Sequence, residues 1–203
     1  YGTEVMPEST LIRLKSIFPN AKIKQTYGLS ELGVLRSKSE SDNSVWLKVG
    51  GKGFETKIID GYLWVRSHSN MVGYLNAKNP IDRDGWMNTG DQVEVKGDYI
   101  RIIGRKSELI NIGGQKVFPI EIETILLEID NINEATVFGQ NNSIMGQIIA
   151  ADISLGTSEN KNALIDRIRK HCFKKLAKWK IPIKFNIVSK EEQMNIRFKK
   201  KRT

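Results

Sequence analysis

The stretch DGWMNTGD, residues 84–91, lies among short strand-like segments. Two glycines and several short polar side chains surround its tryptophan and its methionine. A hairpin turn does not need so many polar groups. Two questions follow: what the closing Asp91 holds, and why Arg105 ends a later strand-like segment.

Short segments that alternate apolar and polar residues lie on both sides of this stretch. They read VWLKV, FETKIID and YLWVRS before it, and QVEVK and YIRIIG after it. Asp60-Gly61 and Gly97-Asp98 separate two pairs of these segments, and such dipeptides are strong hairpin signals. Residues of about 45 to 104 are therefore predicted to form a small, antiparallel, barrel-like β unit.

The pattern changes after Gly104, where helical segments begin to alternate with strands. A helix is predicted to start at Pro119, with Glu121 and Glu123 near its positive N-terminal end. A second helix is predicted at about 161–178, and the order is strand-strand-helix-strand-strand-helix-strand. The fold class is therefore α+β, with a compact α+β domain following the β unit.

Composition fits a soluble globular protein, because 39% of the 203 residues are hydrophobic and 27% are charged. No apolar run approaches the roughly 20 residues of a membrane span, and no signal peptide is visible, so a cytoplasmic protein is expected. The single Cys172 excludes an internal disulfide and lies at an apolar position of the second helix, which predicts a core residue. His68 and His171 are too few for a zinc site.

The net charge of +9 is concentrated near one end of the chain. Residues 170–203 hold 12 of the 32 basic residues and only 2 of the 23 acidic residues. Such a segment can bind nucleic acid, a membrane surface or a phosphate-rich small molecule, or can form a solvated surface. Nucleic-acid binding is disfavoured, because these residues show no aromatic interleaving of the recognition type beyond Phe173 and Trp179, which the second helix can bury.

Two further motifs accompany DGWMNTGD. YGLSE, residues 27–31, can offer a stacking face, a close backbone approach, a phosphate hydrogen bond and a metal-binding acid. GRKSELINIGGQKVFPIEIE spans residues 104–123. In this order and spacing the three motifs resemble those of the adenylate-forming superfamily, which includes acyl-CoA synthetases, peptide-synthetase adenylation domains and luciferases. The resemblance implies that residues 1–105 end a large adenylation domain and that residues 106–203 form a small, mobile C-terminal domain.

The resemblance implies that ATP or AMP is bound by a set of matching residues: Tyr27, Gly28, Ser30, Asp91 and Arg105. Asp91 is expected to bind the ribose hydroxyls, and Arg105 to reach the ribose or the phosphate. A carboxylate suits a vicinal diol and a guanidinium suits a phosphate. The alternative is that Asp91 caps a turn and Arg105 pairs with a local acid.

The YGLSE motif is expected to serve the base, the α-phosphate and the metal ion. By resemblance, Tyr27 packs on the adenine, Ser30 contacts the α-phosphate, and Glu31 helps to hold Mg²⁺ and acts in catalysis. A carboxylate is the kind of hard oxygen ligand that magnesium prefers.

The implied reaction is the ATP-dependent activation of a carboxylic acid as an acyl-adenylate, followed by transfer to coenzyme A. The small domain is expected to swing between the two steps about a hinge at Ser107, where this family more often has an acid or a lysine. Gly113 and Gly114 are expected to line the channel for the pantetheine arm of coenzyme A, where a side chain would obstruct it.

A catalytic lysine is expected near the C-terminal end. Aligning Arg202 with the arginine that closes the family motif makes Lys199 the candidate for contacting the carboxylate and the α-phosphate. Phe198 stands where the motif has glycine, and Lys200 is the rival. The alternative is a disordered basic end.

The phosphate loop and the acid pocket of this superfamily are absent from these residues, so the chain is expected to be a fragment that is inactive alone. The stretch GGQKVFPIEIE resembles acyl-CoA synthetases more closely than peptide-synthetase domains, which load a carrier protein. A carrier protein nevertheless stays possible as acceptor. A module that binds nucleotides without catalysis is another alternative.

Overall fold

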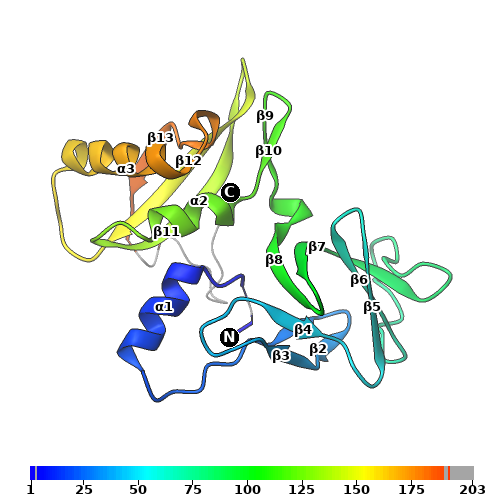
Figure 1. The fold of residues 1–203 in the computed structure, drawn as a ribbon. Coiled ribbons are helices and arrows are strands. Elements are labelled where there is room, and N and C mark those ends of the chain that lie inside the picture. Colours follow the sequence, from blue (N-terminus) through cyan, green and yellow to red (C-terminus); the bar gives the residue numbers. More distant parts are fainter. Residues whose placement is uncertain (3, 190–191, 193–203) are drawn as a thin grey trace. The chain divides into compact units, whose positions relative to one another are not determined.

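The computed structural model describes residues 1–2, 4–189 and 192 of the chain, which divides into two compact units, Tyr1–Ser107 and Glu108–Thr203 (Figure 1). Lys199 and Lys200 lie outside the described residues. No helix in the described part of the chain is long and apolar enough to cross a membrane.

The first unit is built on an open, six-stranded antiparallel sheet with the strand order β3-β4-β8-β7-β6-β5. Its strands are β3 (Ser37–Ser39), β4 (Leu47–Val49), β5 (Phe54–Ile59), β6 (Tyr62–Ser67), β7 (Trp86–Lys96) and β8 (Tyr99–Arg105). The unit also contains helix α1 (Glu8–Ile17) and an antiparallel ribbon of β1 (Tyr27–Leu29) and β2 (Gly33–Leu35). Its core consists of Tyr27, Leu32, Leu35, Leu47, Leu63, Val65, Met87, Val93 and Ile100.

The two predicted hairpins of this sheet are confirmed. Strand β5 turns into β6 at Asp60-Gly61, where the φ angles are 52° and 78°. Strand β7 turns into β8 at Gly97-Asp98, where Gly97 has a φ of 59°. Glycine adopts positive φ without strain and aspartate tolerates it, so these dipeptides set the two turns locally.

The second unit combines a hairpin, a three-stranded sheet and two helices (Figure 1). In chain order its elements are the short 3₁₀ helix η1 (Lys106–Glu108), which begins in the first unit, then β9 (Ile110–Ile112), β10 (Gln115–Val117), α2 (Pro119–Leu126), β11 (Ile132–Asn142), β12 (Gly146–Leu155), α3 (Lys161–Lys175), η2 (Lys178–Lys180) and β13 (Lys184–Ile187). Strands β11 and β12 pair antiparallel, whereas β12 and β13 pair parallel. The α+β class and the predicted order of elements are confirmed.

The core of the second unit lies between its sheet and the apolar faces of its helices. It includes Ile122 and Leu126 of α2 and Leu164, Ile168 and Cys172 of α3. Burial raises the pKa of the Cys172 thiol to about 11, with a smaller contribution from the negative charge of Glu128. Cys172 is therefore a core residue, as its position in the sequence predicts.

Helix α3 ends at Lys175, earlier than the predicted end at about residue 178. Leu176 takes an extended backbone, with φ of −120° and ψ of 149°, and packs against the core. Trp179 in the following 3₁₀ turn packs there as well. The packing of these two side chains against the core accompanies an end of the helix that lies before the end predicted from the sequence pattern. The expectation that the helix buries Phe173 is wrong, because that side chain is 58% exposed.

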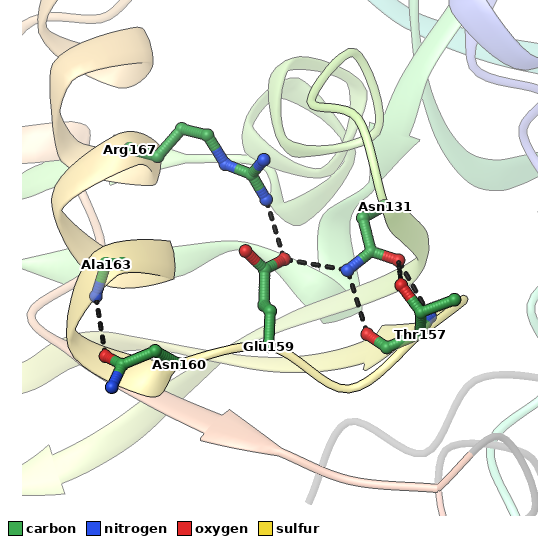
Figure 2. Close-up of polar contacts among 6 residues, drawn as sticks. All are labelled: Asn131, Thr157, Glu159, Asn160, Ala163 and Arg167. Atoms are coloured by element: carbon green, nitrogen blue, oxygen red, sulfur yellow. Dashed lines mark hydrogen bonds and ion pairs between the residues drawn. The ribbon is translucent and has the colours of Figure 1, made fainter.

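A polar cluster joins the start of β11 to the start of α3 (Figure 2). The Asn131 side chain accepts a hydrogen bond from the Thr157 amide at 2.8 Å and donates one to Glu159 Oε1 at 2.8 Å. Glu159 Oε1 also accepts a hydrogen bond from Arg167 Nη2 at 2.7 Å. Asn131 has a φ of 72°, a left-handed conformation that asparagine tolerates better than most residues.

Candidate functional site

Strand β7 bulges between Asn88 and Gln92. On the neighbouring strand β6, Tyr62 is paired with Gln92 and Trp64 with Asn88, so only Leu63 faces the three residues Thr89, Gly90 and Asp91. A β-bulge turns side chains away from the regular alternation of the strand. The bulge therefore decides where the Asp91 carboxylate points.

The polar residues of DGWMNTGD replace the strand hydrogen bonds that the bulge removes. The Thr89 hydroxyl donates to the Leu63 carbonyl at 2.8 Å and accepts from the Asp91 amide at 3.1 Å. The Asn88 side chain accepts from the Gly90 amide at 2.8 Å, and Gly90 has a φ of 75°. These contacts explain why the stretch carries so many polar groups: they fix the backbone around Asp91.

The Asp91 carboxylate is buried, with a relative exposure of 3%, and each of its oxygens has a partner. Tyr27 Oη donates to Oδ2 at 2.6 Å, and Arg105 Nε donates to Oδ1 at 2.8 Å. Asp91 and Arg105 are directly paired in the β7–β8 register. The β7–β8 hairpin thus brings Arg105, 14 positions later in the sequence, opposite Asp91. Both residues belong to the first unit.

The electrostatics of this cluster keep Tyr27 protonated. Burial raises the pKa of the Tyr27 phenol well above its usual range, and the negative charge of Asp91 raises it further. The phenol is thus a permanent hydrogen-bond donor to Asp91. Tyr27 is only 4% exposed in this structure. The packing of its ring on an adenine stays a prediction.

The carboxylate of Glu31 is bound by a tyrosine that the sequence does not single out. Tyr74 Oη donates to Glu31 Oε1, and the Met71 amide donates to the Glu31 carbonyl at 2.9 Å. Ser30 is exposed in the turn between β1 and β2. In the described part of the chain no group of three or more His, Cys, Asp or Glu side chains could hold a metal ion. One carboxylate fits Mg²⁺ that arrives with phosphate ligands, because this ion is usually held by one or two carboxylates and a substrate.

The glycines predicted to contact ligands are needed by the backbone. A Cβ atom on Gly28 would lie 2.8 Å from the Gly33 carbonyl oxygen, which is too close for any other residue in this ribbon. Gly113 and Gly114 form the β9–β10 turn with φ of 55° and 89°. Ser107 lies in η1, where the first unit ends.

Of the predicted site residues, the structure brings three together by direct contact, because Tyr27 and Arg105 both donate hydrogen bonds to Asp91.

Three comparisons relate this chain to known proteins. Residues 121–199 match the family model of the AMP-binding enzyme C-terminal domain. The chain is 32% identical over 197 residues to acyl-CoA synthetase 7 of Caenorhabditis elegans, an alignment that covers 88% of this chain and 36% of that protein. It is 31% identical over 192 residues to 4-coumarate–CoA ligase 4 of Arabidopsis thaliana, covering 83% and 33%.

Solved structures share the fold. The anthranilate CoA ligase AuaEII, solved in complex with anthranoyl-AMP, matches with a TM-score of 0.76 at 24% sequence identity. The match covers 93% of this chain and 40% of that chain. The present chain spans about a third of the length of the curated relatives named above.

Proposed function

We propose that this chain forms part of an ATP-dependent acid–thiol ligase of the cytoplasm, because it belongs to the adenylate-forming superfamily and corresponds to the C-terminal portion of an AMP-dependent acyl-CoA ligase. A carboxylate oxygen of the substrate attacks the α-phosphorus of ATP, and pyrophosphate leaves. The sulfur of a thiol then attacks the acyl carbon, and AMP leaves. The names of the curated relatives support coenzyme A as the thiol.

The observation that carries this proposal is the Asp91 carboxylate between Tyr27 and Arg105. A carboxylate offers about four acceptor sites, so two hydrogen bonds leave capacity for two ribose hydroxyls. The Arg105 side chain is 45% exposed and is proposed to reach the ribose or the phosphate. In this role Tyr27 and Arg105 hold the carboxylate in one orientation, which reduces the cost of ordering it when the nucleotide binds.

The remaining contacts of the nucleotide are proposed for the β1–β2 ribbon. Ser30 is assigned to the α-phosphate and Glu31 to Mg²⁺, which would neutralise charge on the phosphate oxygens. Glu31 would supply one of the oxygen ligands of that ion. Tyr74, which donates to the same carboxylate, would then hold Glu31 in place.

The predicted C-terminal domain, residues 106–203, is proposed to supply the residues that change between the two steps. Lys199, or its rival Lys200, would stabilise negative charge on the carboxylate and the α-phosphate during adenylation. Ser107 is the proposed hinge, and the Gly113-Gly114 turn the proposed wall of the coenzyme A channel. Residues 1–105 and 106–203 would thereby divide the work between nucleotide binding and domain motion.

Nucleotide binding by the chain tests the proposal directly. We expect AMP to bind at least tenfold more tightly than 2′,3′-dideoxy-AMP, because the diol makes charge-assisted hydrogen bonds worth about 1.5–3 kcal/mol. Asp91→Asn should lower AMP affinity by a similar factor and abolish the preference for the diol. Isothermal titration calorimetry measures both effects.

The exposed ion pair between Lys48 and Asp98 offers a matched control, because Asp98→Asn removes the same charge at the turn between β7 and β8. Equal binding of AMP and the dideoxy analogue to the unsubstituted chain would contradict the role of Asp91. Thioester formation by the full-length protein with coenzyme A, compared with an acyl carrier protein, separates the two acceptors. An unchanged adenylation rate in Lys199→Ala of the full-length protein would favour the alternative of a non-catalytic nucleotide-binding module.

A further inference from the structure

The outward face of α3 carries two kinds of cation. Arg167 is paired with Glu159 at 2.7 Å, and Lys175 is paired with Glu128 at 2.6 Å. In contrast, Arg169, Lys170 and Lys174 are exposed and form no ion pair with the described residues. Asp166 lies one helical turn before Arg169 and Lys170 and offsets part of their charge, so the three cations outnumber the acid of this face and its field stays positive.

A hollow of about 510 Å³ follows this face of the helix. Its lining residues are Ala163, Asp166, Arg167, Lys170, His171 and Lys174. Residues three or four positions apart lie on one side of a helix, so most of these side chains form a single row. The row is roughly 16 Å long at 1.5 Å per residue. All six residues belong to α3, so the hollow is an open groove that runs along one helix, with mainly positive side chains and the single acid Asp166.

An apolar side chain stands at the edge of this groove. Phe173 is 58% exposed, and it lies one helical turn from Arg169 and Lys170. The apolar face of α3 is on the other side, where Leu164, Ile168 and Cys172 are buried in the core. Aromatic residues and arginine are enriched in protein–protein contacts, and charged groups lie mainly at the rim, so Phe173 beside Arg169 fits such a contact with the lysines at its rim.

We propose that this groove, lined by Arg167, Lys170 and Lys174 and bordered by Arg169 and Phe173, docks an acidic helix of a partner protein. Carboxylates at intervals of three to four residues would meet the row of cations, and an apolar side chain would cover Phe173. A bilayer fits this face poorly, because the apolar side of α3 is buried and cannot insert. Nucleic acid fits poorly as well, because a single aromatic ring offers no stacking platform.

Binding of a designed peptide to the full chain tests this proposal. The probe is a helical peptide of about 18 residues, of which a central stretch of about 11 spans the groove at 1.5 Å per residue, with Glu at every third or fourth position and one Leu on the same side. We expect amide NMR shifts to map to α3 and the affinity to fall at least about threefold as salt rises from roughly 0.05 M to 0.5 M. Lys170→Glu combined with Lys174→Glu should weaken binding at least about tenfold.

The matched control is Lys38→Glu combined with Lys184→Glu, which makes the same change in net charge at exposed lysines outside the groove. Retained binding in this control and lost binding of a peptide with Gln in place of Glu support the docking site. Equal loss in both double variants, or retained binding in the α3 variant, overturns it. Stronger association with vesicles rich in anionic lipid, or with duplex DNA, also overturns it. Circular dichroism checks that each variant keeps its helix.

Discussion

At the scale of single residues, Glu123 shows an acidic side chain whose role is structural. Its carboxylate is fully buried in α2 and accepts a hydrogen bond from the Val137 amide at 2.8 Å. Val137 lies in β11, an edge strand of the three-stranded sheet, and edge strands carry amides without a strand partner. Glu123 thus ties α2 to the sheet. Its predicted position near the positive N-terminal end of the helix does not indicate this contact.

We expect Glu123→Ala to lower the free energy of unfolding by about 1–3 kcal/mol, because a buried amide loses its acceptor. Glu123→Gln should cost less, since the amide carbonyl of glutamine can still accept the bond. Urea denaturation measures both values. Asp130→Ala, an exposed acid in the same unit, is the control. A Glu123→Ala variant as stable as this control would show that the buried bond contributes nothing.

At the scale of secondary-structure elements, the N-terminus of α3 depends on a single capping residue. Asn160 Oδ1 accepts hydrogen bonds from the amides of Asn162 at 3.0 Å and Ala163 at 3.1 Å, the second of which is drawn in Figure 2. Asn160→Ala should lower stability by about 1 kcal/mol, whereas Asn160→Asp should keep the cap. Thermal unfolding followed by circular dichroism measures the difference. Asn162→Ala removes an exposed asparagine that is not the cap, and it should change stability less.

Elements whose signals are local were predictable, and elements set by distant contacts were not. Asp60-Gly61 and Gly97-Asp98 indicate their hairpins because the required positive φ depends on the turn residues themselves. The bulge at Asp91 depends on hydrogen bonds to a neighbouring strand, so the polar residues show that something is fixed there but not how. The Tyr27–Asp91 contact joins residues 64 positions apart, and no periodicity encodes it. Tyr74 escapes prediction for the same reason.

At the scale of the whole molecule, the two hydrophobic cores draw their buried residues from separate parts of the chain. The first core runs from Tyr27 to Ile100, and the second runs from Ile110 to Phe185. A unit with its own core can fold by itself. The charge is divided as well, because residues 170–203 carry 12 basic and 2 acidic residues while the rest of the chain is close to neutral.

Residues 108–203 expressed alone should therefore fold with the secondary structure they have in the full chain. Their apolar core contains residues of α2, α3 and all three strands of the β11-β12-β13 sheet, so cutting before Glu108 removes none of it. Amide NMR spectra of the shorter chain should reproduce the shifts that core residues such as Ile153 and Ile168 show in the full chain. A spectrum with collapsed dispersion would mean that this core needs residues of the first unit. An Ile168→Asp variant of the shorter chain, which buries an unpaired charge, supplies the unfolded reference.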